Sequence, residues 1–154
     1  MITREHYLYF TGRALNGMIE IVTGLGDDLA NRRPALEGAN SPYAVLHHCL
    51  GVVTYWVGWL VAGRPVDRDR GAEFEAHGPV DELVGHAREV EALLHTDVSE
   101  VDLEAPLHGF PPPEFGGPDI RLDRGVVLLH VYEELAQHHG QMEIMRDVLL
   151  AESR

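Results

Sequence analysis

Residues that break regular secondary structure divide this chain into four long segments, and each segment repeats its apolar residues at the spacing of an α-helix. Strand signals are poor, because alternating branched residues bounded by Asn-Gly or Asp-Gly turns are missing. We find no internal repeat, low-complexity tract or flexible linker. The sequence therefore predicts an all-α four-helix bundle that forms a single domain over residues 1–154.

Each predicted helix has a recognisable start. Thr3 is placed to cap the first helix, and the second opens with a capping Ser41 followed by Pro42 at the first helical position. The third has the weakest periodicity and should be the shortest, whereas the fourth has the clearest apolar stripe. The predicted helices run over about residues 4–23, 41–63, 79–94 and 123–149.

A long Pro/Gly-rich connection, over about residues 96–122, joins the third and fourth helices. It contains three consecutive prolines, Pro111 to Pro113. Loops of this length in compact domains often form functional rims or lids, but a proline-stiffened crossover between helices is an equal alternative. Of its residues, His108 is the one we expect to be able to overhang a site.

The charge balance argues against several classes of partner. Twenty-five acidic residues against 12 basic ones give a net charge of −13, which repels nucleic acid and anionic lipid. We expect no apolar run of the roughly 20 residues that span a bilayer and no signal peptide, and so a cytoplasmic protein. Cys49, the only cysteine, can form no internal disulfide, and the absence of Lys excludes Schiff-base chemistry.

The apolar stripe of the fourth predicted helix is interrupted by a carboxylate and an imidazole, Glu134 and His138. Their spacing of four residues places both side chains on one helical face. A buried carboxylate needs a partner or a cation, and His48 lies on the apolar stripe of the second helix. Two imidazoles and one carboxylate form the ligand set of catalytic zinc and non-haem iron sites.

Simpler interpretations of the same residues stay open. A lone histidine such as His48 on an apolar face is more often a hydrogen-bonded core residue than a metal ligand. Glu134 and His138 could form an ordinary salt bridge on an exposed helix. The spacing alone does not decide between these alternatives and a three-ligand site.

Two stretches of the chain form recognisable motifs: Ser41-Pro42, His48 and Tyr55-Trp56 in the first, and His130 to Glu134 with His138 to Gln141 in the second. These motifs resemble the DinB-like superfamily, and most closely its branch with the mycothiol-dependent maleylpyruvate isomerase N-terminal domains. The resemblance covers nearly the whole chain and implies a four-helix bundle that holds a divalent metal with His48, Glu134 and His138. Many DinB-like proteins have a second histidine where this chain has Glu134, whereas the mycothiol branch has the Glu-x-x-x-His form.

Other histidines on the same helices have different expected roles. His47 and His139 are rotated about 100° from their neighbours in the predicted triad and should not bind the same ion. His130 shares the face of Glu134 but lies two turns from His138. We predict His130 as the catalytic candidate, which orients Glu134 or meets substrate, although a core-edge histidine bonded to a carbonyl is an equal alternative.

The remaining candidates have mostly structural interpretations. Cys49 is expected to fill the core, since no partner base is evident. The aromatic residues suit the core or a homodimer interface better than substrate stacking. A basic cluster after the second helix suits exposed surface, with capture of an anionic substrate or thiol as the alternative. These two groups are Tyr7, Tyr55, Trp56 and Trp59, and Arg64, Arg68 and Arg70.

The resemblance suggests a divalent-metal-dependent S-transferase or isomerase that activates a small-molecule thiol of the mycothiol type toward a small-molecule electrophile. Zinc is the leading metal, and nickel, iron or manganese also suit the ligands. Two alternatives are a metal-dependent hydrolase, in which water is the attacking group, and a non-catalytic, metal-stabilised ligand-binding bundle that forms a homodimer.

Overall fold

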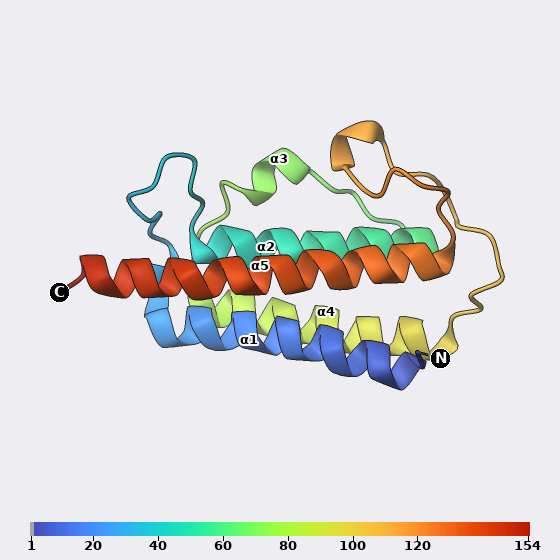
Figure 1. Cartoon of the computed structure of the whole chain (residues 1–154), viewed down its shortest axis with the longest axis horizontal. Helices are drawn as coiled ribbons and strands as arrows, with labels where there is room; N and C mark the ends of the chain where they lie inside the picture. The colour runs from blue at the N-terminus through green and yellow to red at the C-terminus, as the bar shows by residue number, and fades with distance from the viewer. Residues whose placement is uncertain (1) are drawn as a thin grey trace.

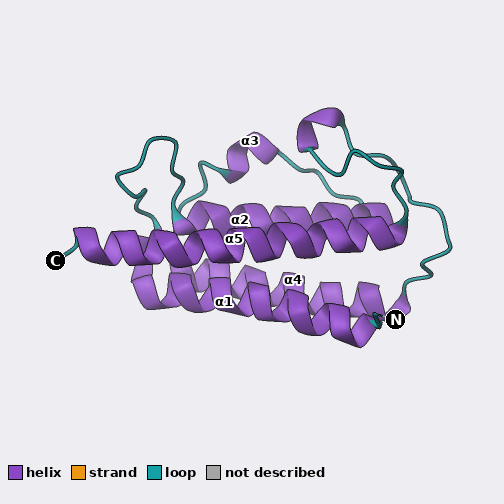
Figure 2. Cartoon of the chain, viewed as in Figure 1, coloured by secondary structure: helices purple, strands orange, loops and turns teal. Residues whose placement is uncertain are grey.

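The computed structural model describes residues 2–154, and this part of the chain contains helices and loops but no strand (Figures 1 and 2). The predicted all-α class is confirmed. Within the described residues the helices are α1 (Arg4–Ala30), α2 (Pro42–Val53), the π-helix η1 (Thr54–Val61) that continues α2, α3 (Arg70–Glu73), α4 (Val80–Glu100), the 3-10 helix η2 (Pro113–Phe115) and α5 (Arg124–Glu152).

The long helices lie side by side, with α1 and α4 along one side of the molecule and α2, η1 and α5 along the other (Figure 1). α1 contacts both α4 and α5, and α2 contacts α5. Their facing sides share one apolar core, because each helix turns its aliphatic stripe inward. The fully buried side chains of this core include Leu15, Met18, Leu46, Leu50, Leu94, Leu135 and Met142.

The predicted N-terminal caps are present. The Thr3 hydroxyl accepts a hydrogen bond from the backbone N–H of His6, and the Ser41 hydroxyl accepts one from Ala44, at 3.2 and 3.1 Å. Asp123 caps α5 in the same way. These short polar side chains satisfy helix N–H groups that have no partner within the helix, so they fix where the helices begin.

α1 and α4 continue six or seven residues beyond their predicted ends. α1 continues beyond Thr23 to Ala30, because Gly26 adopts a φ of 67° that kinks the helix and lets Leu25 and Ala30 stay buried. The prediction that the third helix is the shortest was wrong. α4 has 21 residues, whereas the continuous helix Pro42–Val61 has 20 and α3 has four. α4 extends to Glu100 because Leu94 and Val98 keep its apolar face in the core.

The expectation that no apolar run reaches bilayer-spanning length was also wrong. Pro42–Val61 has 20 residues with a hydropathy of 1.4, which by length and composition is enough to cross a membrane. A buried core helix has the same composition, and 78% of an 18-residue stretch of this helix is buried inside the molecule. The apolar character of this helix is thus used in packing.

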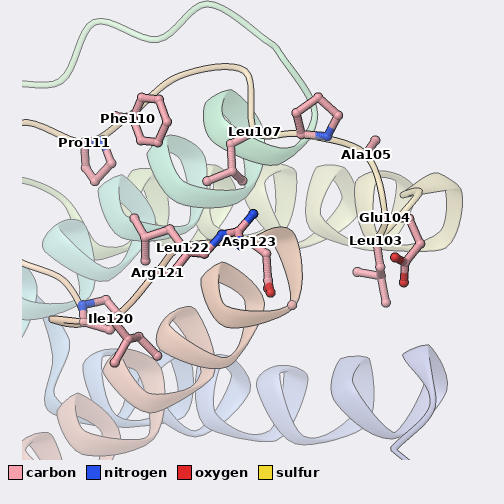
Figure 3. A pocket seen from close by; sticks show the side chains of 13 residues that line it. Leu103, Glu104, Ala105, Leu107, Phe110, Pro111, Ile120, Arg121, Leu122 and Asp123 are labelled. Carbon is pink, nitrogen blue, oxygen red and sulfur yellow. The ribbon is translucent and has the colours of Figure 1, made fainter.

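The long connection, residues 101–123 in the structure, is packed against the helices. The Arg124 guanidinium donates hydrogen bonds to the carbonyls of Asp102 and Pro106, and the His108 N–H donates to the Leu60 carbonyl. Between the connection and the start of α5 lies a pocket of about 1250 Å³, lined mainly by the loop's own side chains (Figure 3).

Candidate metal centre

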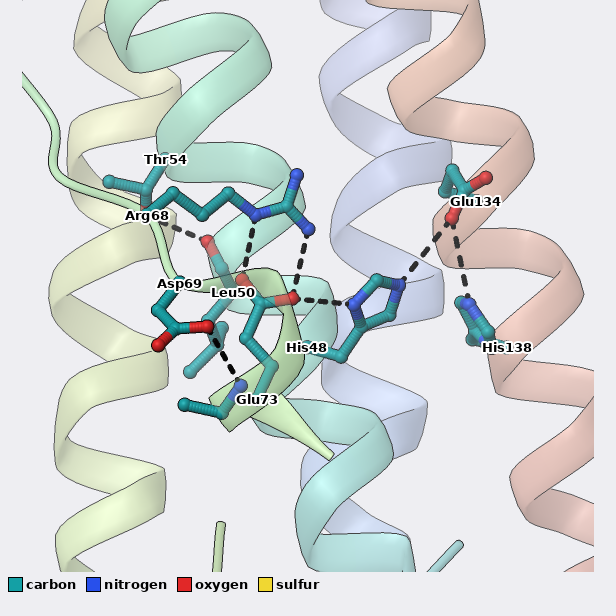
Figure 4. A network of polar contacts seen from close by, with 9 residues as sticks. His48, Leu50, Thr54, Arg68, Asp69, Glu73, Glu134 and His138 are labelled. Atoms are coloured by element: carbon teal, nitrogen blue, oxygen red, sulfur yellow. Dashed lines mark hydrogen bonds and ion pairs between the residues drawn. The ribbon is translucent and has the colours of Figure 1, made fainter. Parts of the chain in front are cut away.

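Three side chains from α2 and α5 converge on one point (Figure 4). His48 of α2 and His138 of α5 each direct Nε2 toward Oε2 of Glu134, at 3.7 and 3.5 Å. One potential ligand atom from each residue lies within 4.8 Å of the other two. The sequence prediction that these residues come together is therefore met by the geometry, although His48 precedes Glu134 by 86 residues in the chain.

The cluster is buried on one side and open on the other. The His48 side chain is 3% exposed, whereas those of Glu134 and His138 are 28% and 23% exposed. The neighbouring side chains of His138 and His48 hold the pKa of Glu134 well below its ordinary value, so the carboxylate is ionised at neutral pH. One carboxylate and two imidazoles on a partly open face suit a divalent cation with a coordination position to spare.

The outer nitrogens of both imidazoles also have partners. His138 Nδ1 lies 2.8 Å from Oε1 of Gln141, one turn further along α5. His48 Nδ1 lies 2.7 Å from Oε2 of Glu73, which Arg68 also contacts. Sequence reasoning missed Glu73, because it lies in a short helix with no apolar periodicity of its own. The capping signal of Asp69, which accepts a hydrogen bond from Ala72 N, was the available clue to that helix.

The neighbouring histidines are directed elsewhere, as the helical rotation predicts. The His47 ring lies 6.2 Å from that of His86 on α4. His139 is directed at α1, where a Cβ added to Gly17 would lie 2.2 Å from His139 Nε2. Neither belongs to the triad of potential ligand atoms.

His130 is buried one turn before Glu134. Its ring packs edge-on against Trp56, with 4.5 Å between ring centroids, and its Nδ1 lies 3.7 Å from a carboxylate oxygen of Glu133. The His130 ring is thus held between η1 and its own helix α5, which also carries Glu134.

The predicted basic cluster is divided among separate partners. Arg64 pairs with Asp97 of α4, Arg68 pairs with Glu73, and Arg70 lies over the ring of Phe74. Two of the three guanidinium groups are thus held by carboxylates of this chain, and the arginines do not form one exposed anion-binding patch.

His108 lies near the C-terminal end of η1. Its ring lies 6.4 Å from that of Trp59, and its Nε2 lies 3.5 Å from the Arg124 guanidinium. His108 therefore does not overhang the triad, which was the position that the sequence suggested for it. The pocket in Figure 3 likewise includes none of the three triad residues.

Cys49 follows His48 but points into the core, where it is fully buried. Burial raises the pKa of its thiol well above the ordinary value, so the reactive thiolate is scarce. We expect the native protein to resist a disulfide-exchange reagent at pH 8 and to release one equivalent of thiol only after unfolding in guanidinium chloride. Rapid labelling of the native chain, monitored by absorbance, would contradict this assignment.

The structure defines the class of protein as an all-helical chain with a potential His-Glu-His metal site between two of its helices. Comparison with known families identifies the particular family. The family described as Mycothiol-S-transferase matches residues 8–150, a range that includes the whole triad. The chain belongs to the mycothiol-S-transferase family. This confirms the resemblance to a DinB-like, mycothiol-related family. No curated protein matches the chain.

Proposed function

We propose that this protein is a divalent-metal-dependent S-transferase that joins a low-molecular-weight thiol of the mycothiol type to a small electrophile. The observation that carries the proposal is the convergence of His48, Glu134 and His138 on a partly open face. The transferase family supports the reaction class. We propose further that residues 1–154 form a single domain, in which α1, α2 with η1, α4 and α5 make a DinB-like four-helix bundle.

His48, Glu134 and His138 are the proposed metal ligands, with zinc the leading candidate and nickel, iron or manganese also suited. A divalent ion held there would lower the pKa of a thiol bound to it and so would supply a thiolate at neutral pH. In the transfer, the thiolate sulfur forms a bond to an electrophilic carbon, and the electron pair of the broken bond departs with the leaving group. An isomerase of the same family type would add and later expel the thiol.

The chain's own residues provide the surroundings for this chemistry. A protein nucleophile is not needed, since the buried Cys49 thiol and the absence of Lys leave that role to the small thiol. We propose that His130, beside Trp56 and one turn from Glu134, orients Glu134 or meets the substrate.

We also propose the location and partners of the protein. A net charge of −13 repels nucleic acid and anionic membranes, so we propose that the protein binds neither and is cytoplasmic. The burial of Pro42–Val61 among the other helices supports its role as a core helix. Homodimer formation stays a prediction, which sedimentation would test.

Thiol consumption tests the proposed reaction. Purified protein mixed with mycothiol and a haloaromatic electrophile should consume thiol well above the uncatalysed rate, and treatment with a chelator should return the rate to background. Ester cleavage that needs metal but no thiol would replace the proposal with a hydrolase. Bound metal without turnover across a panel of thiols and esters would replace it with a non-catalytic binding protein.

A further inference from the structure

The connection between η1 and α4, residues 62–79, places a buried carboxylate behind His48 (Figure 4). Glu73 Oε2 lies 2.7 Å from His48 Nδ1, on the side of the ring away from Glu134. Arg68 donates two hydrogen bonds to Glu73, from Nε to Oε1 at 2.7 Å and from Nη2 to Oε2 at 2.9 Å. The side chains of Arg68, Glu73 and His48 are 3%, 6% and 3% exposed.

Several features hold this arrangement in place. Asp69 caps the short helix α3 that carries Glu73, and Phe74 stacks on the His48 ring with 4.7 Å between centroids. Gly51 of α2 leaves the space that Glu73 occupies, since a Cβ there would lie 2.0 Å from Glu73 Oε1. The approach of α3 to α2 therefore depends on a missing side chain one turn beyond His48.

The chemistry of the contact defines the state of the His48 ring. The Arg68 guanidinium donates to both carboxylate oxygens of Glu73, a bidentate contact that holds Glu73 in its ionised form. An ionised carboxylate only accepts hydrogen bonds, so His48 Nδ1 must be the donor. In the neutral imidazole the other nitrogen, Nε2, then carries the lone pair, and Nε2 is the atom that faces Glu134.

We propose that Arg68 and Glu73 are positioning residues that hold His48 as a metal ligand, with Glu73 fixing the tautomer and orientation of the ring and Arg68 fixing Glu73. A carboxylate behind a ligating imidazole raises its basicity and prevents ring rotation. The inference rests on the proposed metal site but is independent of the reaction that occurs there. It gives residues 62–79 a function other than joining η1 to α4.

Metal affinity of the folded protein tests this role directly. Zinc dissociation constants would be measured by competition with a chromogenic chelator, and the visible spectrum of bound Co²⁺ would report the coordination geometry. Glu73→Gln keeps the shape of the side chain but removes its charge, and should weaken zinc binding about 10-fold. Glu75→Gln is the matched control, because Glu75 is exposed and pairs only with Arg33 and should leave affinity unchanged.

Two further variants guard against misfolding as an explanation. Arg68→Met combined with Glu73→Leu replaces the buried ion pair by apolar side chains of similar size, a change that folds often tolerate. This double variant should stay folded and bind zinc about 100-fold more weakly. Gly51→Ala leaves both charged residues intact but displaces Glu73, and should also weaken zinc binding and alter the Co²⁺ spectrum.

The outcomes separate this inference from the proposed function. If the variants lower the melting temperature of the metal-free protein but keep wild-type zinc affinity, the residues are merely structural and the inference fails while the transferase stands. If zinc binding depends on Glu73 but thiol transfer is absent in the wild type, the transferase proposal fails and the inference stands. If the wild type binds no divalent metal, both fail.

Discussion

A His138→Ala variant is expected to lose the divalent metal that the wild type binds at about one ion per chain. Removing one of the three proposed protein ligands leaves Glu134 on α5 and His48 on α2 as the remaining members of the triad. The loss in affinity should exceed the roughly 100-fold that is typical of removing an outer partner of a ligand. Elemental analysis of unchelated protein would measure the stoichiometry, and thiol transfer should fall to background.

His139→Ala is the matched control, since the adjacent imidazole faces Gly17 on α1 and not the triad. It should retain the metal. Zinc at 100 times its dissociation constant stabilises a native state by about 2.7 kcal/mol, so added zinc should raise the melting temperature of the wild type and of His139→Ala only. Full metal content in His138→Ala would refute the three-ligand site.

The starts of the long helices were predictable, because local hydrogen bonds determine where a helix begins. The caps Thr3, Ser41 and Asp123 mark the starts, because a short side-chain oxygen satisfies N–H groups whichever way the helix later packs. The end of α1 was not predictable in this way. Gly24 and Gly26 indicate a stop, but burial of Leu25 before the kink and of Ala30 beyond it outweighs the glycine penalty.

The residues of the candidate site likewise separate into those that local sequence predicts and those that only the tertiary structure reveals. Glu134 and His138 share a helical face by spacing alone, and His48 lies on the inward face of its own helix. Glu73 could not be found, because its position against His48 depends on a loop path and on the space beside Gly51. Such a contact is a tertiary property, and no periodicity in residues 62–79 encodes it.

Trp56 gives the second large expected effect. Its side chain is 1% exposed and packs against the His130 ring, and a Cβ added to Gly117 of the long connection would lie 2.6 Å from its six-membered ring. Trp56→Ala would open a cavity where η1, α5 and the connection meet. We expect the free energy of unfolding to fall by about 3–5 kcal/mol, a large share of the roughly 5–15 kcal/mol typical of a domain.

Trp59, one turn away, provides the comparison. It is only partly buried and lies against Gly109 and His108 of the connection, so Trp59→Ala should cost well under half as much as Trp56→Ala. Urea unfolding, followed by circular dichroism, should use chelator-treated protein, because metal bound to the native state adds its own stabilisation. A larger loss for Trp56→Ala would support its packing against His130 and Gly117 as the stronger contribution to stability. Equal losses for the two variants would contradict this prediction.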